Sequence, residues 1–190
     1  MSKPFTVDVH GLKNFSEKER QKFSLAMKEL ERVVSSPAFK EAILAHNFDD
    51  QTNGKTNQEL YDDFMNGSDK FNQMNDRDMD VHLTMFYSWK STIGYTYPST
   101  WWTWINRKFF KRFGSDEIAM NVTHEDRHND GYDHRSARDH DSVPYAFGYI
   151  VRDLIRGIVP PVSYTNRRRK PVRKRRSFMS RVRGFFRRLF

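Results

Sequence analysis

The sequence contains no cysteine in 190 residues. Disulfide bonds, thiolate metal ligands and a cysteine nucleophile are therefore excluded. Long apolar runs are also missing: no stretch of about 18 apolar residues occurs, so the sequence predicts no transmembrane helix. The first 15 residues contain no apolar core of a signal peptide, and we expect no secretory signal there. A cytoplasmic location is the default expectation, with peripheral attachment to a membrane as the alternative.

Acidic residues are missing from the last part of the chain. From 167 to 190, 12 of 24 residues are Lys or Arg and none is Asp or Glu. The rest of the chain carries 21 basic and 24 acidic residues, so the net charge of +9 belongs to this tail. Hydrophobic residues make up 37% of the chain, which is enough to bury a core. The sequence predicts a folded domain over residues 1–162 and a basic tail over residues 163–190.

The tail has two parts with different patterns. Two basic clusters, Arg167–Lys170 and Arg173–Arg176, flank Pro171 and are typical of extended, solvated chain. From Phe178 on, apolar residues recur at helical spacing among arginines, which predicts a cationic amphipathic helix. Residues 167–190 therefore suit an anionic membrane surface or the phosphates of nucleic acid, or they dock on their own domain. The closely spaced phenylalanines favour lipid.

Helices dominate the first half of the predicted fold. Ser16 is a good N-cap because two acidic residues follow it in the first turn of an apolar 3.6-residue pattern. In the next helix, Phe39, Ile43 and Leu44 are expected on one face. The elements expected here are a strand over 5–9, helices over 17–34, from 36 onward and over 58–67, and a loop over 47–57.

Strands and two longer helices are expected in the second half. A helix capped by Ser115 should run to about Asp130 and end at Gly131, which favours the left-handed conformation of a helix end. Pro160 and Pro161 should end the last helix. The elements expected here are strands over 80–89, 93–97 and 101–110, followed by helices over 115–130 and 143–159. The order of elements predicts an α/β (α+β) fold.

Residues 124–134 read H-E-x-x-H-x-x-G-x-x-H and predict a metal site. His124 and His128 are four residues apart, so on a helix they share a face and can bind one ion. Gly131 lets the chain turn back, and His134 then adds a third nitrogen ligand. Three histidines with a fourth position left for water are the donor set of catalytic Zn²⁺. The alternative is a solvated, histidine-rich loop.

The eleven-residue pattern resembles the signature of the metzincin clan of zinc endopeptidases. Further segments look like little-characterised bacterial and phage-type metzincin-like proteins, so the resemblance covers roughly residues 80 to 155. These segments are Gly94–Pro98, Thr103–Asn106 and Ser142–Gly148. The resemblance implies a twisted mixed sheet with N-terminal helices, an active-site helix and a C-terminal helix. It also implies hydrolysis of a peptide or protein substrate.

The resemblance assigns roles to two further residues. Glu125 would be the general base that takes a proton from the metal-bound water and passes it to the leaving amine. Tyr145 would stabilise the oxyanion, or else its hydroxyl is structural and packs under the site. The cleft should lie between the loop after His134 and an edge strand, near 93–98 or 101–106. An extended peptide could pair with that strand.

The chain also departs from the metzincin pattern. Val143 or Pro144 stands where metzincins place the methionine of a turn under the metal. Asp126 and Arg127 occupy helix positions that are normally uncharged. Asp126 continues the helix face of Ala119 and Val122, which we expect to leave the core there, so Asp126 should point away from the metal and reach solvent or a salt bridge. These departures favour the rival interpretation: a weak or inactive zinc-stabilised binding module whose tail binds an anionic membrane or nucleic acid.

Other polar residues are assigned weaker roles. His140 is expected to be a solvated loop residue rather than a group that supports the site or contacts substrate. His10, His46 and His82 are distant in sequence and are expected to pack or face water. Asp133 either orients a histidine ring or stabilises the turn before His134.

Overall fold

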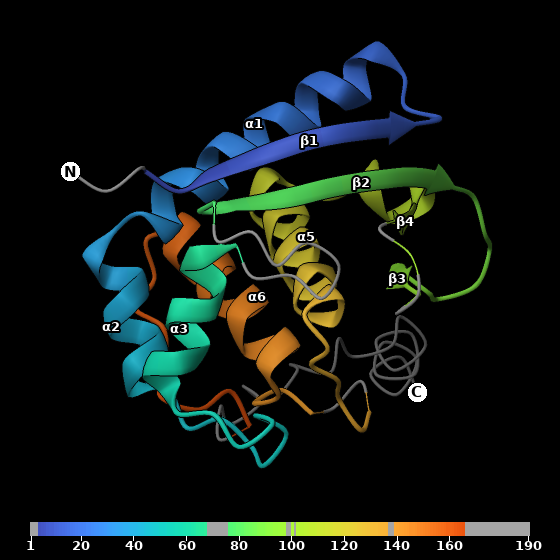
Figure 1. Ribbon diagram of the computed structural model, residues 1–190. Coiled ribbons are helices and arrows are strands. Elements are labelled where there is room, and N and C mark those ends of the chain that lie inside the picture. Colours follow the sequence, from blue (N-terminus) through green and yellow to red (C-terminus); the bar gives the residue numbers. More distant parts are fainter. Residues whose placement is uncertain (1–3, 68–75, 98–99, 101, 137–138, 166–190) are drawn as a thin grey trace, which may run out of the picture.

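The computed structural model describes residues 4–67, 76–97, 100, 102–136 and 139–165 (Figure 1). In chain order the first elements are β1 (Thr6–Lys13), α1 (Glu17–Val34), α2 (Pro37–Ala45), α3 (Asn57–Asn66) and β2 (Asp78–Phe86). The remaining elements are β3 (Gly94–Thr96), β4 (Trp102–Asn106), α4 (Arg107–Phe110), α5 (Ser115–Asn129) and α6 (Val143–Ile155). The fold is mixed α/β, as predicted.

The four strands form one mixed sheet in the order β1-β2-β4-β3. β1 pairs parallel with β2, and β2 pairs parallel with β4, whereas β3 runs antiparallel to β4. β3 is therefore an edge strand and β4 lies inside the sheet. The connection from β1 to β2 carries α1, α2 and α3, because parallel neighbours need a long crossover.

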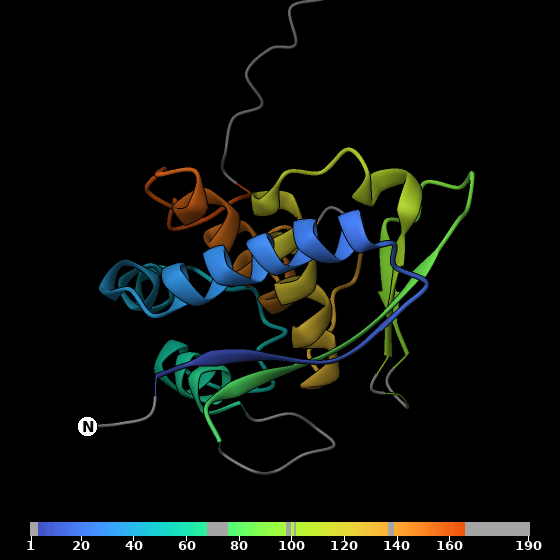
Figure 2. The ribbon, with the colours of Figure 1, turned by 90° about the horizontal axis from the view of Figure 1, so that it is seen from above.

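Helices α1, α5 and α6 lie on one side of strands β1 and β2 (Figure 2). Every second side chain of these strands faces the helices, since successive residues of a strand point to opposite faces. In β2, Met79, Val81, Leu83 and Met85 are buried in the core, and the residues between them are only partly buried. An aromatic cluster of Phe39, Phe64 and Phe147 joins α2, α3 and α6, with ring centroids 5.4–6.1 Å apart.

The helices of the first half match their predicted bounds closely. Ser16 caps α1 in a capping box: its hydroxyl accepts from the Glu19 N–H, and its own N–H donates to the Glu19 carboxylate. α2 buries Phe39 and Ile43, but Leu44 is exposed, so its predicted place on the apolar face is wrong. Leu44 lies about 100° around the helix from Ile43, which turns it out of the core.

The predicted strand over 101–110 is too long. β4 ends at Asn106, and α4 follows at once, because the Asn106 side chain accepts a hydrogen bond from the Lys108 N–H and caps the turn. The aromatic residues favour a strand by propensity alone, and a local cap outweighs that propensity here. The predicted strand over 80–89 likewise ends earlier, at Phe86, and begins earlier, at Asp78.

Two helix ends also differ from the prediction. The N-cap of α5 is Gly114 and not Ser115, and the Glu117 carboxylate accepts from the Gly114 N–H. α6 ends at Ile155, four residues before the predicted end, because Gly157 adopts a φ of 67° and turns the chain out of the helix. The end of α5 before Gly131, which has a φ of 88°, is as predicted.

The last described residues are bound to the folded part. Ser163, Tyr164 and Thr165 all donate hydrogen bonds to the Asp141 carboxylate. Residues 166–190, including the predicted amphipathic helix, lie outside the described residues, and the division at residue 162 stays a prediction. Among the described residues, no helix is long and apolar enough to cross a membrane.

Buried Asn106 connects β4 to the loop that precedes β3. Its amide nitrogen donates to the carbonyls of Ser88 and Thr92, both at 3.0 Å. We expect Asn106→Ala to lower the free energy of unfolding by roughly 2–4 kcal/mol, because several buried backbone groups lose their partner. Urea denaturation would measure this, with Asn47→Ala at an exposed position as the control. Equal losses in both variants would contradict the assignment.

Candidate metal centre

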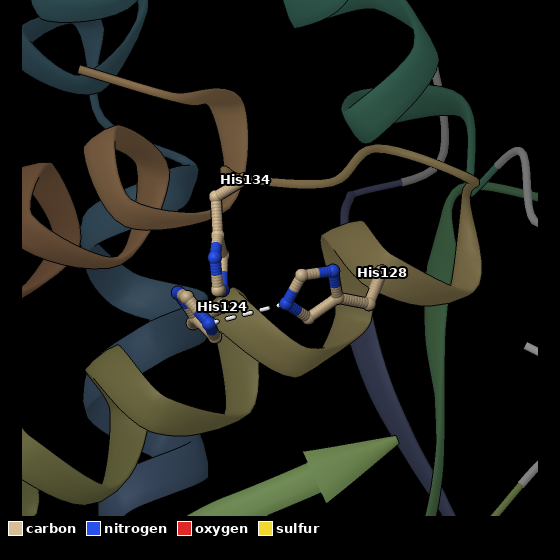
Figure 3. A group of neighbouring side chains, drawn as sticks. All are labelled: His124, His128 and His134. Atoms are coloured by element: carbon tan, nitrogen blue, oxygen red, sulfur yellow. Dashed lines mark hydrogen bonds between the residues drawn. The ribbon is translucent and has the colours of Figure 1, made fainter. Parts of the chain in front are cut away.

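Helix α5 and the loop after it bring three histidines together (Figure 3). His124 and His128 project from one face of α5, while Ile118, Ala119 and Val122 on other faces are buried in the core. His134 comes from the loop that follows the helix, and its ring points toward the other two (Figure 3). The three predicted ligands therefore form one group that could hold a metal ion.

The group is compact. The Nε2 atoms of His124 and His128 are 3.2 Å apart, and the candidate ligand atoms of all three histidines lie within 4.8 Å of one another. The ring of His134 has its centroid 5.3 Å from that of His124 and 5.0 Å from that of His128. Two ligand nitrogens of one tetrahedral ion are separated by about 3.3 Å when each metal–nitrogen bond is about 2.0–2.1 Å. The spacing on α5 fits this value.

Backbone carbonyls orient two of the three rings. The Nδ1 atom of His128 lies 2.8 Å from the carbonyl oxygen of Tyr132, which directs Nε2 toward the group. The carbonyl of Pro144 interacts with the His124 ring and acts against the lowering of its pKa. The Nδ1 atom of His134 is buried and has no hydrogen-bond partner among the described residues. A buried ring nitrogen without a partner is costly, and a bound ion is one way to satisfy it.

Burial keeps the imidazoles of His124 and His128 neutral. It lowers the pKa of His124 to about 3, with a further contribution from the neighbouring His128 and His134. Burial also lowers the pKa of His128, although its bond to the Tyr132 carbonyl acts in the opposite direction. The neutral imidazole is the form that binds a metal, so these two rings are ready to ligate near pH 7.

Glu125 lies beside the group and is 5% exposed. Its Oε2 atom accepts a hydrogen bond of 3.0 Å from the Thr96 hydroxyl, whose oxygen lies 2.8 Å from that of Thr103. Burial raises the pKa of Glu125 to about 7, and the bond from Thr96 acts against this rise. A carboxyl group with this pKa both accepts and releases a proton near neutral pH.

A cleft of about 820 Å³ opens over the three histidines. One wall is the segment from Ser91 to Thr96, which includes β3, and another is formed by Tyr145 and Tyr149 of α6. The cleft therefore runs along the edge strand near 93–97. The alternative placement along 101–106 is wrong, because β4 lies between β2 and β3.

Gly94 lets β3 approach α5. A Cβ atom at this position would lie 3.1 Å from both Glu125 Oε1 and Asn121 Oδ1, and 3.0 Å from the Trp104 carbonyl oxygen. A larger residue would therefore force β3 away from Glu125 and weaken the contact with Thr96. Thr96, Asn121 and the carbonyls of Tyr132 and Pro144 are site groups that the sequence did not reveal, since each acts through a contact between distant segments.

Tyr145 packs directly on the histidines. Its ring centroid lies 4.4 Å from that of His124 and 4.7 Å from that of His134, and Tyr149 stacks on its far side at 5.7 Å. Burial raises the pKa of Tyr145, and the Glu125 carboxylate adds to the rise. Tyr145 lines the cleft and also supports two rings, so both predicted roles remain compatible with its position.

Arg127 and Asp126 form a buried ion pair. The guanidinium, with 3% of the side chain exposed, lies 2.6 Å from the Asp126 carboxylate and 2.5 Å from that of Asp130, and it covers the Phe64 ring at 4.5 Å. Asp126 thus reaches a salt bridge, as predicted. The helix face of Ala119 and Val122 becomes only partly buried at Asp126, whereas the neighbouring Arg127 is buried and brings its charge to two aspartates.

The structure also shows the surroundings of Asp133 and of the histidines outside the metal group. Asp133 accepts a hydrogen bond of 2.7 Å from the backbone N–H of His134, which is the turn-stabilising role. His140 is half-buried, with Nδ1 3.1 Å from the Tyr149 hydroxyl, so the expected solvated position is wrong. His46 is buried, whereas His10 is exposed and stacks on His82 with 5.1 Å between centroids.

Comparisons with family models, with curated proteins and with solved structures give no match to this chain.

Removing the buried guanidinium should unfold the end of α5. We expect Arg127→Met to lower the free energy of unfolding by about 3–5 kcal/mol, because two carboxylates stay buried without their cation. The triple variant that also carries Asp126→Asn and Asp130→Asn should recover much of this loss. Urea denaturation measures both. A triple variant less stable than the single one would contradict this account of the ion pair.

The burial of Glu125 predicts a pH-dependent stability in the metal-free protein. Below pH 4.5 the Glu125 carboxyl is protonated in both the folded and the unfolded protein. Between pH 4.5 and 7 the folded state keeps the proton that the unfolded state releases, so stability is lost as the pH rises. Glu125→Gln lacks this loss, and its stability relative to the wild type should increase from pH 5 to pH 8 by at most about 3 kcal/mol.

Urea denaturation with a chelator present would measure this difference at the two pH values. Glu41→Gln, at an exposed position on α2, is the matched control. A constant difference between Glu125→Gln and the wild type across this pH range would contradict the buried carboxyl.

Proposed function

We propose that the protein is a zinc-dependent endopeptidase. The observation that carries the proposal is the group of three histidines with a buried carboxylate beside it, in a cleft bordered by an edge strand. The pattern of residues 124–134 and its resemblance to the metzincin clan support the same conclusion.

The chemistry of the donors favours zinc. The group offers nitrogen ligands from imidazoles, two of which burial holds in the neutral form. Imidazole suits Zn²⁺, whereas Ca²⁺ and Mg²⁺ prefer oxygen ligands. His134 supplies the third imidazole of the group. Bound there, zinc would polarise a peptide carbonyl and bring the pKa of a water molecule to about 7.

Glu125 is the group that moves the proton. Thr96 fixes one oxygen of its carboxylate, so the other oxygen remains for the attacking water. With a pKa near 7, the carboxyl takes a proton from that water and later gives it to the leaving amine. Both steps use the same side chain and need no large movement.

The substrate is an extended peptide. β3 is an edge strand whose residues line the cleft, so its backbone groups can pair with a peptide laid along it. Tyr145 lines the cleft from the other side and would donate its hydroxyl to the carbonyl oxygen as charge develops there. The high pKa of this hydroxyl keeps it protonated and able to donate.

Zinc content is the first test. Elemental mass spectrometry should find about one zinc per chain in the wild type and almost none in His128→Ala. The control is His10→Ala, at an exposed position on β1, which should keep its zinc. A wild-type chain that takes up no zinc after reconstitution would contradict the metal site.

Peptidase activity is the second test. Glu125→Gln should keep its zinc and lose peptidase activity on an unfolded protein substrate by at least about 100-fold, because the general base is gone. Full activity in this variant would remove Glu125 from the mechanism. Zinc binding without activity in the wild type would favour the rival interpretation, a zinc-stabilised binding module.

A further inference from the structure

Residues 81–115 differ in composition from the rest of the described chain. This segment contains no Asp or Glu and five Lys or Arg residues. It also contains 11 of the 28 aromatic residues of the protein. It forms most of β2, the loop after it, β3, β4 and α4. One end of the molecule is therefore aromatic and basic, with no acidic residue contributed by this segment.

The aromatic side chains gather on the sheet face opposite the helices and on the loop after β2. In β4, Trp102 and Trp104 alternate with buried Thr103 and Ile105, so their rings lie on the face that α5 does not cover. We call this surface, on which three residues are exposed and three are partly buried, the aromatic rim. It consists of Phe86, Tyr87, Trp89, Tyr95, Tyr97 and Trp104.

Three residues of the aromatic rim are open to solvent. Trp89 is 82% exposed, Tyr87 is 56% exposed and Tyr97 is 55% exposed. Exposed aromatic residues that lie in mutual contact mark an interaction surface more often than single exposed apolar residues do. Tyr87 meets the edge of Trp89 at 5.4 Å, and Tyr95 contacts Tyr97 at 5.3 Å.

Cations lie beside the aromatic rim. The Lys108 ammonium donates a hydrogen bond of 3.0 Å to the Trp89 carbonyl, and Lys90 next to Trp89 is exposed. Lys111 and Arg112, which follow α4, are exposed as well. An anionic partner that also accepts aromatic side chains would suit this surface.

The arrangement of the rings favours lipid over nucleic acid. Tyr95 and Trp104 stack on each other with 7° between their planes, and Phe86 and Tyr97 also contact Tyr95. The faces of Tyr95 and Trp104 are used within the protein, and the most exposed rings, Trp89 and Tyr87, contact each other edge to face. Proteins that bind single strands instead offer a series of open faces to successive bases. Tyrosine and tryptophan side chains at a membrane interface need no open face, because their apolar body and polar tip suit the headgroup region.

We propose that the aromatic rim and its neighbouring lysines dock the folded chain on an anionic membrane surface. The aromatic side chains enter the headgroup region, and Lys90 and Lys108 bind acidic lipid headgroups. The residues of this surface are distinct in sequence from those of the basic tail over residues 167–190. The inference does not depend on peptidase activity or on the metal.

Docking in this way would bring the cleft to the membrane. Thr96 contacts Glu125 inside the cleft, while the neighbouring Tyr95 and Tyr97 belong to the aromatic rim. A polypeptide segment that lies close to the membrane surface would then be the nearest substrate for the site.

Vesicle binding by the full chain tests the proposal. The wild type should sediment with vesicles of phosphatidylcholine and phosphatidylserine at 7:3 and only weakly with phosphatidylcholine alone. Trp89→Ala combined with Tyr97→Ala should lower the apparent affinity by at least about tenfold. Leu25→Ala, 62% exposed on α1, is the matched control and should bind as the wild type does. Equal binding by all three would overturn the proposal.

A second readout separates the aromatic rim from the tail. Brominated lipids should quench the tryptophan emission of the wild type on binding, and most of this quenching should disappear in Trp89→Phe. Binding with unchanged tryptophan emission would mean that another segment holds the membrane, and the proposal would fail. It would also fail if the double variant lost affinity for a labelled single-stranded oligonucleotide while the wild type ignored vesicles.

Discussion

A buried guanidinium holds the part of the molecule on which the metal group depends. Arg127 enters the core over the Phe64 ring and pairs with Asp126 and Asp130. Its backbone carbonyl accepts the Tyr132 N–H at 3.1 Å, and the Tyr132 carbonyl in turn faces Nδ1 of His128. Because buried charges tolerate little misalignment, the turn that carries them has one arrangement. The turn that carries the buried charges thus also holds the carbonyl that orients His128.

Burial has opposite consequences for the proton on the two kinds of titratable group in the site. It removes the charge from His124 and His128, which frees their nitrogens for a metal, and it removes the charge from Glu125 by holding a proton on it. Near neutral pH, His124 and His128 are therefore neutral and Glu125 is about half protonated. An arriving dication would find these two imidazoles neutral and a carboxyl group that releases its proton easily, so metal binding and activation of Glu125 as a base are favoured together.

The sequence predicts best what is local. The spacing of His124 and His128, the helix that carries them and its end before Gly131 follow from periodicity and capping, and α1 follows from the Ser16 cap. The supporting groups could not be predicted, because the contact of Thr96 with Glu125 spans 29 residues. Propensity misled where a local contact opposed it: the aromatic run after Trp101 favours a strand, but the Asn106 side chain caps a helical turn. The burial of Arg127 could not be predicted either, because it depends on contacts with Phe64 on α3 and Phe147 on α6, which are distant in sequence.

β3 connects the chemistry of the cleft to the surface outside it. Because side chains alternate along a strand, three residues of β3 serve two environments. Gly94 and Thr96 face Glu125. Gly94 leaves room for the Glu125 carboxylate, and the Thr96 hydroxyl donates a hydrogen bond to it. Tyr95 stacks on Trp104 in the aromatic rim. A membrane in contact with the aromatic rim and a peptide in the cleft would therefore both act on β3. This short strand pairs with β4, and Asn106 at the end of β4 donates a hydrogen bond to the segment just before β3. Contact at one surface would restrict the strand that borders the other.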